Sequence, residues 1–148
     1  MKRILILFSS LIVLLSACSP LANSEFRGNH EKWQMANLSH YRFGLSVSCF
    51  CAFSQRMPLT IEVQDGKVVS MTYNDGSPVP EADRSIFAQY ETIEDLFTFT
   101  RDAISRADEI HVTYDSTYGY PSIVQIDFVR NAADDELDLT VQSIEPLN

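Results

Sequence analysis

The sequence is poor in the motifs by which many enzymes are recognised. It contains no glycine-rich phosphate loop, no Gly-x-Ser-x-Gly turn and no His-Glu-x-x-His metal motif. Only five glycines and three histidines occur among its 148 residues. These absences argue against the enzyme classes that such motifs mark, although catalytic side chains can also be scattered along a chain. We expect a protein that is not an enzyme and that carries no cofactor or metal.

Basic residues are also scarce. Eleven lysines and arginines stand against 20 aspartates and glutamates, which gives a net charge of −9. An acidic surface repels phosphate backbones and anionic lipid headgroups. The composition therefore predicts no nucleic-acid partner and no membrane docking through a basic patch.

The amino-terminal apolar run is too short for a transmembrane helix. Lys2 and Arg3 precede the apolar stretch 4–15, which only Ser9 and Ser10 interrupt. A membrane span needs about 20 apolar residues. The basic start, the short apolar core and the small residues that follow are typical of a secretory signal peptide over residues 1–17.

Leu15-Ser16-Ala17-Cys18 resembles the lipobox of bacterial lipoproteins. The resemblance implies a diacylglycerol on the Cys18 thiol, removal of residues 1–17, and an acyl chain such as palmitate on the new amino terminus. Two or more acyl chains form a stable membrane anchor, since each buried CH₂ contributes about 0.8 kcal/mol. The alternative is an ordinary signal peptide with an accidental cysteine. Ser19 after the cysteine implies the outer membrane if the host is Gram-negative.

Cleavage before Cys18 changes the composition of the mature chain. It leaves 131 residues, with 9 basic and 20 acidic side chains and a net charge of −11. That length suits one domain. We expect a polar tether over residues 18–29 and a single domain over residues 30–148, held by lipid in the bacterial cell envelope.

Hydrophobic periodicity predicts an α+β domain with the order αβββαβββ. Alternation predicts a strand over 41–51, then a hairpin over 59–73 whose three-residue loop 64–66 pairs Ile61 with Val69. The clearest helix follows Thr92, because Thr92 and Asp95 resemble a capping box before an apolar stripe. We expect a further helix over 30–39, a loop over 74–91, and strands over 109–115, 120–129 and 137–144. Short connections favour an antiparallel sheet, with the helices packed on one face in two layers.

Cys49 and Cys51 remain as a pair once Cys18 is lipidated, as an oxidising compartment favours. In an extended strand their Cα atoms would lie about 6.6 Å apart, near the upper limit for a disulfide, so closure needs a local bend. We expect a structural disulfide or two buried thiols. A redox pair and a metal site are alternatives, although the spacing is not Cys-x-x-Cys and the histidines show no ligand spacing.

Two loops carry the other candidate sites. Tyr118, Gly119, Tyr120 and Pro121 form a possible binding loop, since aromatic side chains on a turn can hold a partner. Alternatively, the glycine and proline shape the turn and one tyrosine packs inward. The acidic run 131–138 could bind Ca²⁺ but lacks the EF-hand pattern, and a solvated hairpin tip is the simpler interpretation.

The order of these motifs resembles a family of uncharacterised bacterial secreted proteins and lipoproteins that share a domain of unknown function. The resemblance covers the chain from Trp33 onward and implies no activity, cofactor or catalytic residue. The residues that carry it are Trp33 with Tyr41, Cys49-Phe50-Cys51, Val63-x-x-Gly66-x-Val68, Leu96-Phe97, Gly119-Tyr120-Pro121 with Asp127, and Asp134-Asp135-Glu136.

These observations favour a non-enzymatic binding or structural module at the membrane surface. Its sheet face or its 118–121 loop would contact an envelope protein. A thiol–disulfide protein that uses Cys49 and Cys51 is one alternative. An inhibitor of an envelope enzyme is another, by analogy with other small α+β domains.

Overall fold

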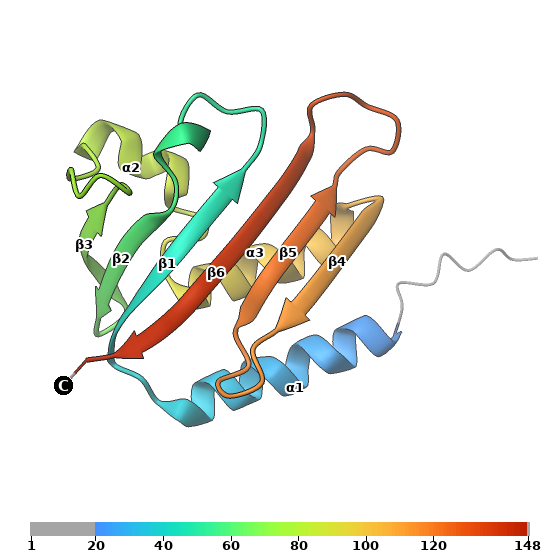
Figure 1. Ribbon diagram of the computed structural model, residues 1–148. Coiled ribbons are helices and arrows are strands. Elements are labelled where there is room, and N and C mark those ends of the chain that lie inside the picture. The colour runs from blue at the N-terminus through green and yellow to red at the C-terminus, as the bar shows by residue number, and fades with distance from the viewer. Residues whose placement is uncertain (1–19, 148) are drawn as a thin grey trace, which may run out of the picture.

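The computed structural model describes residues 20–147, which form an α+β domain with one six-stranded antiparallel sheet and three α-helices (Figure 1). The expected α+β class is confirmed. The proposed signal peptide and Cys18 lie outside the described residues. Within residues 20–147, no helix has the length and apolar character needed to cross a membrane. In chain order the elements are α1 Pro20–Ala36, β1 His40–Ser48, the 3-10 helix η1 Ser54–Arg56, β2 Leu59–Gln64, β3 Lys67–Thr72, α2 Glu81–Phe87, α3 Ile93–Arg106, β4 Glu109–Tyr114, β5 Pro121–Asp127 and β6 Glu136–Pro146.

The sheet consists of two three-stranded meanders joined through its centre. The strand order is β3-β2-β1-β6-β5-β4, so β1 and β6 pair although they lie at opposite ends of the described chain. Their register places Tyr41 opposite Pro146 and Ser48 opposite Asp138. The end of β1 therefore lies directly beside the start of β6.

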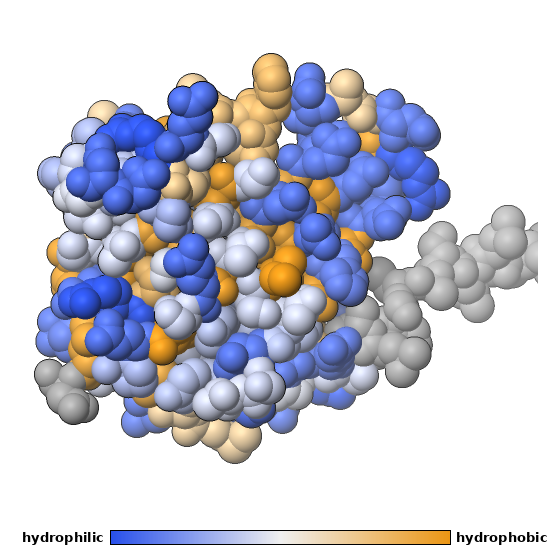
Figure 2. Space-filling view, viewed as in Figure 1, coloured by the Kyte–Doolittle hydropathy of each residue, from blue (hydrophilic) through white to orange (hydrophobic). Residues whose placement is uncertain are grey.

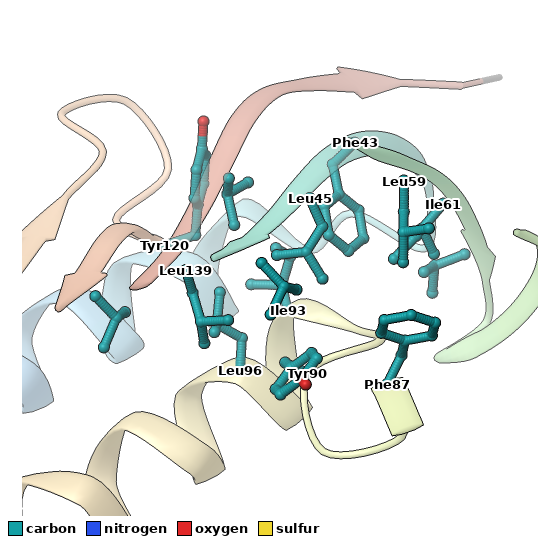
Figure 3. Packing of buried hydrophobic residues seen from close by; sticks show 14 of the residues in the cluster. Phe43, Leu45, Leu59, Ile61, Phe87, Tyr90, Ile93, Leu96, Tyr120 and Leu139 are labelled. Carbon is teal, nitrogen blue, oxygen red and sulfur yellow. The ribbon is translucent and has the colours of Figure 1, made fainter. Parts of the chain in front are cut away.

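One face of this sheet forms the core. Tyr41, Phe43, Leu45 and Val47 alternate along β1 and are all buried. Figure 1 shows α3 behind the sheet, and Figure 3 shows its side chains meeting those of the strands. Burial of such side chains contributes about 1.5–3 kcal/mol each. Further members of the cluster are Leu59, Ile61, Phe87, Tyr90, Ile93, Leu96 and Leu139.

Helix α3 begins where the capping motif predicts. Thr92 is its N-cap, and the Thr92 hydroxyl oxygen accepts a hydrogen bond from the Asp95 amide at 3.1 Å. The same hydroxyl donates to Asp95 Oδ2 at 2.6 Å. The residues on its apolar stripe are buried against the sheet: Ile93, Leu96, Phe97, Thr100 and Ala103.

Helix α1 corrects the prediction for the amino-terminal segment. It begins at Pro20, so residues 20–29 are helical instead of forming an irregular tether. The cause is tertiary packing: the Phe26 and His30 rings both contact Phe97, with ring centroids 5.7 and 4.6 Å away. Trp33, a further turn along, stacks edge-on against Tyr41. The face of α1 that contacts the rest of the domain has one such residue per turn, and one of these residues is a histidine. Apolar periodicity therefore does not reveal this helix.

A second correction concerns residues 74–91, which we expected to be a loop. They contain α2, a seven-residue helix that starts after Pro80 and buries Phe87. The observed helix and strand order is therefore αβββααβββ. The segment was difficult to predict because two helical turns are too short to show a periodic stripe.

The β2–β3 hairpin also differs from the expected register. Its loop has two residues, Asp65 and Gly66, both with positive φ, as a type I′ turn requires. Ile61 lies opposite Met71, and the faces stay matched because a bulge leaves Val69 unpaired and 51% exposed. The expected three-residue loop is wrong because the extra residue lies within β3 and not in the turn.

The 116–120 loop docks on α1. Gly119 has a φ of +81°, and a Cβ atom on this residue would lie 2.5 Å from the carbonyl oxygen of Asn29 in α1. Lys32 Nζ of α1 donates a hydrogen bond to the carbonyl of Ser116. The Gly-Tyr-Pro motif therefore contains the glycine that allows this close approach.

Gly119→Ala should destabilise the domain more than Gly76→Ala. Gly76 also has a positive φ but has open space around it, so its substitution adds only the left-handed backbone cost of about 1–2 kcal/mol. The collision with α1 should add about 1–3 kcal/mol at Gly119. Denaturant unfolding of both variants measures the difference. Equal losses would show that α1 is not held at this point.

Candidate functional site

Strand β1 ends where the chain turns to close a disulfide bond. The last strand residue is Ser48, three residues before the expected end, and Cys49 is bonded to Cys51. Their Cα atoms lie 5.2 Å apart, closer than an extended strand allows. The structure therefore has the expected disulfide and not two buried thiols. Both cysteines are partly exposed, and Cys49 packs against the edge of the core.

Hydrogen bonds hold this loop in addition to the disulfide. The Cys51 amide donates to the Cys49 carbonyl at 2.7 Å. The Ser54 hydroxyl lies within hydrogen-bond distance of the Cys51 carbonyl at 2.8 Å and of the Cys49 carbonyl at 3.1 Å. The Ser54 amide also donates to the Cys51 carbonyl. The 49–51 loop is therefore fixed at its base by one side chain of η1.

The side chain at the tip of this loop is exposed. Phe50 is 87% exposed, the highest value among the large apolar side chains described for residues 23–147. Beside it lies a shallow depression of about 500 Å³ lined by Cys49, Phe50, Cys51, Ala52, Ser54 and Gln55. Figure 2 shows apolar atoms that protrude at this end of the sheet, next to hydrophilic surface over the β5–β6 connection. An aromatic ring on a fixed loop is the type of group that anchors protein interfaces.

The sequence itself indicates that the position of Phe50 is unusual, although the cysteines on either side of it are the more obvious feature. Alternation places both cysteines on the apolar face and Phe50 on the opposite face. A phenylalanine on the polar side of a strand is unusual. In the structure, the Phe50 side chain indicates the candidate site more clearly than the two cysteines do.

Acidic side chains gather beside this loop on the open face of the sheet. Pairing places Asp138 opposite Ser48 of β1 and also opposite Gln125 of β5, and places Glu136 opposite Asp127. We call the following residues the acidic corner: Asp108, Glu109, Asp127, Asp135, Glu136 and Asp138. Much of it lines a depression of about 380 Å³ that also includes His111.

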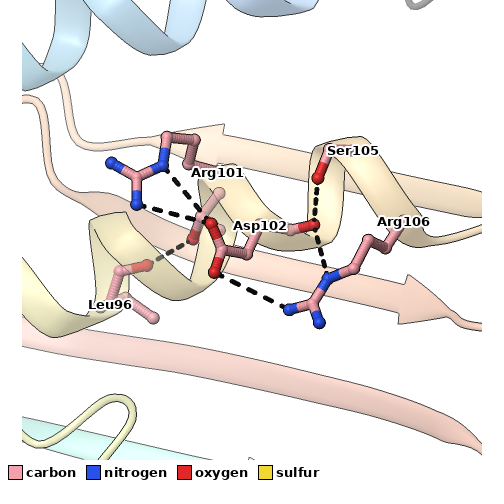
Figure 4. A network of polar contacts seen from close by, with 6 residues as sticks. Leu96, Arg101, Asp102, Ser105 and Arg106 are labelled. Carbon is pink, nitrogen blue, oxygen red and sulfur yellow. Dashed lines mark hydrogen bonds and ion pairs between the residues drawn. The ribbon is translucent and has the colours of Figure 1, made fainter.

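Little positive charge compensates the acidic corner. The Arg130 guanidinium lies 3.9 Å from the Glu109 carboxylate. No other ion pair among the described residues involves the acidic corner. Elsewhere the acids are better paired: Asp102 of α3 interacts with two arginines, Arg101 and Arg106 (Figure 4). The acidic corner is thus a locally unneutralised negative surface.

The charges of the acidic corner act on Asp127. Partial burial raises the pKa of its carboxyl group, and the negative charges of Asp135, Glu136 and Glu109 raise that pKa further. One oxygen each of Asp127 and Asp135 is buried without a hydrogen-bond partner. Across residues 20–147, no three potential ligand side chains converge closely enough to hold a metal ion.

The 118–121 loop presents less surface than the sequence suggested. Tyr120 is 5% exposed, packs edge-on against Trp33 and donates its hydroxyl to the Gln142 carbonyl at 3.1 Å. Tyr118 is partly buried, and its amide donates to Asp115 Oδ1. This arrangement matches the alternative in which the motif shapes a turn and one tyrosine packs inward. The binding role of the loop stays a prediction that would depend on Tyr118.

Asp127→Asn should raise the melting temperature at pH 7. Because folding raises the pKa of Asp127, its ionised form costs stability at neutral pH, and this cost disappears as the pH falls below the unfolded value of about 3.9. Thermal unfolding at about pH 7 and pH 3 should therefore show a gain that vanishes at the lower pH. Glu31→Gln, at an exposed position of α1, is the control. A gain that persists at low pH would contradict the electrostatic cause.

Comparison with known proteins finds a family model that covers most of the chain. No curated protein and no solved structure matches the chain. The model of a family described as a family of unknown function (DUF6174) matches residues 25–146, which include the whole sheet, α3 and the 49–51 loop. The chain belongs to this family of unknown function, DUF6174.

Proposed function

We propose that this chain is a lipid-anchored protein of the bacterial envelope that acts by binding another envelope protein through its 49–51 loop. The observation that carries the proposal is the 87% exposure of Phe50 on a loop fixed by a disulfide. An exposed phenylalanine loses contact with water when a partner covers it, and this burial contributes about 1.5–3 kcal/mol.

The rigidity of the loop supports binding. Ordering a flexible loop on association costs about 0.5–1.5 kcal/mol for each immobilised side chain. Here the disulfide and the Ser54 hydrogen bonds order the backbone before any partner arrives. A preorganised aromatic tip therefore keeps most of its contact energy as affinity.

The lipid anchor supplies the location in this proposal. The Leu15-Ser16-Ala17-Cys18 sequence supports it, and so does the mature net charge of −11, which gives the domain no attraction of its own for anionic lipid. The acyl chains would hold the domain at the membrane while its surface remains free to bind a partner.

Mass spectrometry of the mature protein tests the anchor. We expect the first residue to be Cys18 with acyl chains on its thiol and its amino group, and Cys18→Ala to leave residues 1–17 attached. An uncleaved wild-type chain, or an unmodified Cys18 at the mature terminus, would contradict the anchor. Chemical trapping of free thiols before this measurement also reports the state of Cys49 and Cys51.

A thiol–disulfide function is the second candidate. Both sulfur-bearing residues are partly exposed and line the depression beside Phe50, so another protein could reach the bond. A protein that exchanges thiols in the cell passes through mixed disulfides with other proteins, and trapping of thiols should reveal such adducts or a reduced fraction. A binding domain should keep Cys49 and Cys51 fully oxidised in the same measurement.

A photo-reactive side chain at position 50 tests the binding function. We expect Phe50→p-benzoylphenylalanine to give one major cross-linked adduct in intact cells of the host. Met35, which is 78% exposed on α1, is the matched control position, and the same substitution there should not give that adduct. An interface centred on Phe50 brings the partner within reach of that position alone.

The alternative outcomes of this experiment are distinct. The same adduct from both positions would indicate nonspecific proximity in the envelope. No adduct from position 50, in a variant that is folded and correctly located, would overturn the proposed function.

A further inference from the structure

We propose that the surface that binds the 49–51 loop is a basic protein surface, in which lysines and arginines surround an apolar pocket for Phe50. This inference rests on the proposed function and identifies the chemistry of the partner. It follows from the fold, which places the apolar tip and the acidic corner at the same end of one sheet.

The β1–β6 register sets the proximity of the two features. Ser48 and Asp138 are directly opposite each other, so their Cα atoms are about 4.5–5.5 Å apart. Phe50 follows Ser48 by two residues, and Glu136 precedes Asp138 by two. A partner that covers the Phe50 ring therefore also covers or borders these two carboxylates.

The free state of these carboxylates supports a charged partner. Glu136 and Asp138 are exposed, and neither side chain makes a hydrogen bond or an ion pair with any described residue. Opposite Glu136 on β5 lies Asp127, whose pKa is raised by burial and by the neighbouring negative charges. Basic side chains from a partner would relieve this repulsion, whereas an acidic or neutral surface would not.

The geometry favours a protein over other cationic ligands. Across residues 20–147, the carboxylates do not converge on a point where a metal ion could bind. They are spread along β5 and β6, with Glu109 on β4 at the far edge. Lysine and arginine side chains from a partner surface can reach separate carboxylates at such spacings, and each would be paired at the rim of the apolar contact.

In this arrangement, the aromatic ring and the carboxylates contribute to different steps of recognition. The burial of Phe50 slows dissociation, because the ring must be resolvated before the complex separates. The exposed carboxylates instead attract a basic partner before contact and accelerate association. Their effect should weaken as ionic strength rises.

Cross-linking from position 50 in a neutralised background tests the inference. The probe is p-benzoylphenylalanine at position 50, in intact cells, with the adduct yield measured on blots. We expect Glu136→Gln with Asp138→Asn to lower the yield about threefold to tenfold. The matched control is Glu31→Gln with Asp65→Asn, which removes two exposed charges away from the 49–51 loop and should leave the yield unchanged.

The attachment site gives a second measurement. Mass spectrometry of the adduct should place the cross-link in a partner segment flanked by lysine or arginine. Equal yields in the neutralised and control backgrounds, or attachment within an acidic segment, would overturn this inference and leave the binding function intact. No adduct even in the otherwise unchanged chain would remove the binding function and this inference together.

Discussion

The pairing of β1 with β6 is the interaction on which the rest of the structure depends. It joins two meanders into one sheet and places the 49–51 loop beside the first residues of β6. The two strands pack closely: a Cβ atom on Gly44 would lie 2.7 Å from the side-chain oxygen of Gln142. Without this central pairing, Phe50 and the acidic corner would belong to separate sheets, and the proposed interface would have no common surface.

The two ends of the sheet differ in how they are used. At the end near α1, the Gly119 turn and the Trp33 and Tyr120 rings lock the helix to the sheet. At the other end the chain turns outward at Cys49 and leaves an aromatic ring in water. Exposing Phe50 forgoes the stabilisation that burial in the core would give. We interpret that loss as the consequence of a binding role, because the disulfide and the Ser54 hydrogen bonds hold the loop that exposes the ring.

The sequence predicted the elements whose signals are local. Alternation found β1, and the capping residues Thr92 and Asp95 found the start of α3. It failed where a tertiary contact decides the structure. Phe26 and His30 hold α1 against α3. The bulge at Val69 keeps the apolar faces of β2 and β3 matched, which a two-residue turn without the bulge would not do.

The candidate site was predicted only in part for the same reason. The pairing of Cys49 with Cys51 could be anticipated from the cysteine count, and the need for a local bend from strand geometry. The exposure of Phe50 depends on where β1 stops, which periodicity does not specify. The neighbouring carboxylates come from β5 and β6, and only the strand order brings them to the end of β1.

The most direct test of the proposed interface is the affinity of the isolated partner for the domain with and without the Phe50 ring. If the ring is the anchor of the interface, Phe50→Ala should weaken binding about 30-fold, the effect expected for a central aromatic side chain. Met35→Ala, on a similarly exposed apolar residue of α1, should leave the affinity unchanged. Equal affinities of the Phe50→Ala variant and the wild-type domain would contradict a binding role for the 49–51 loop.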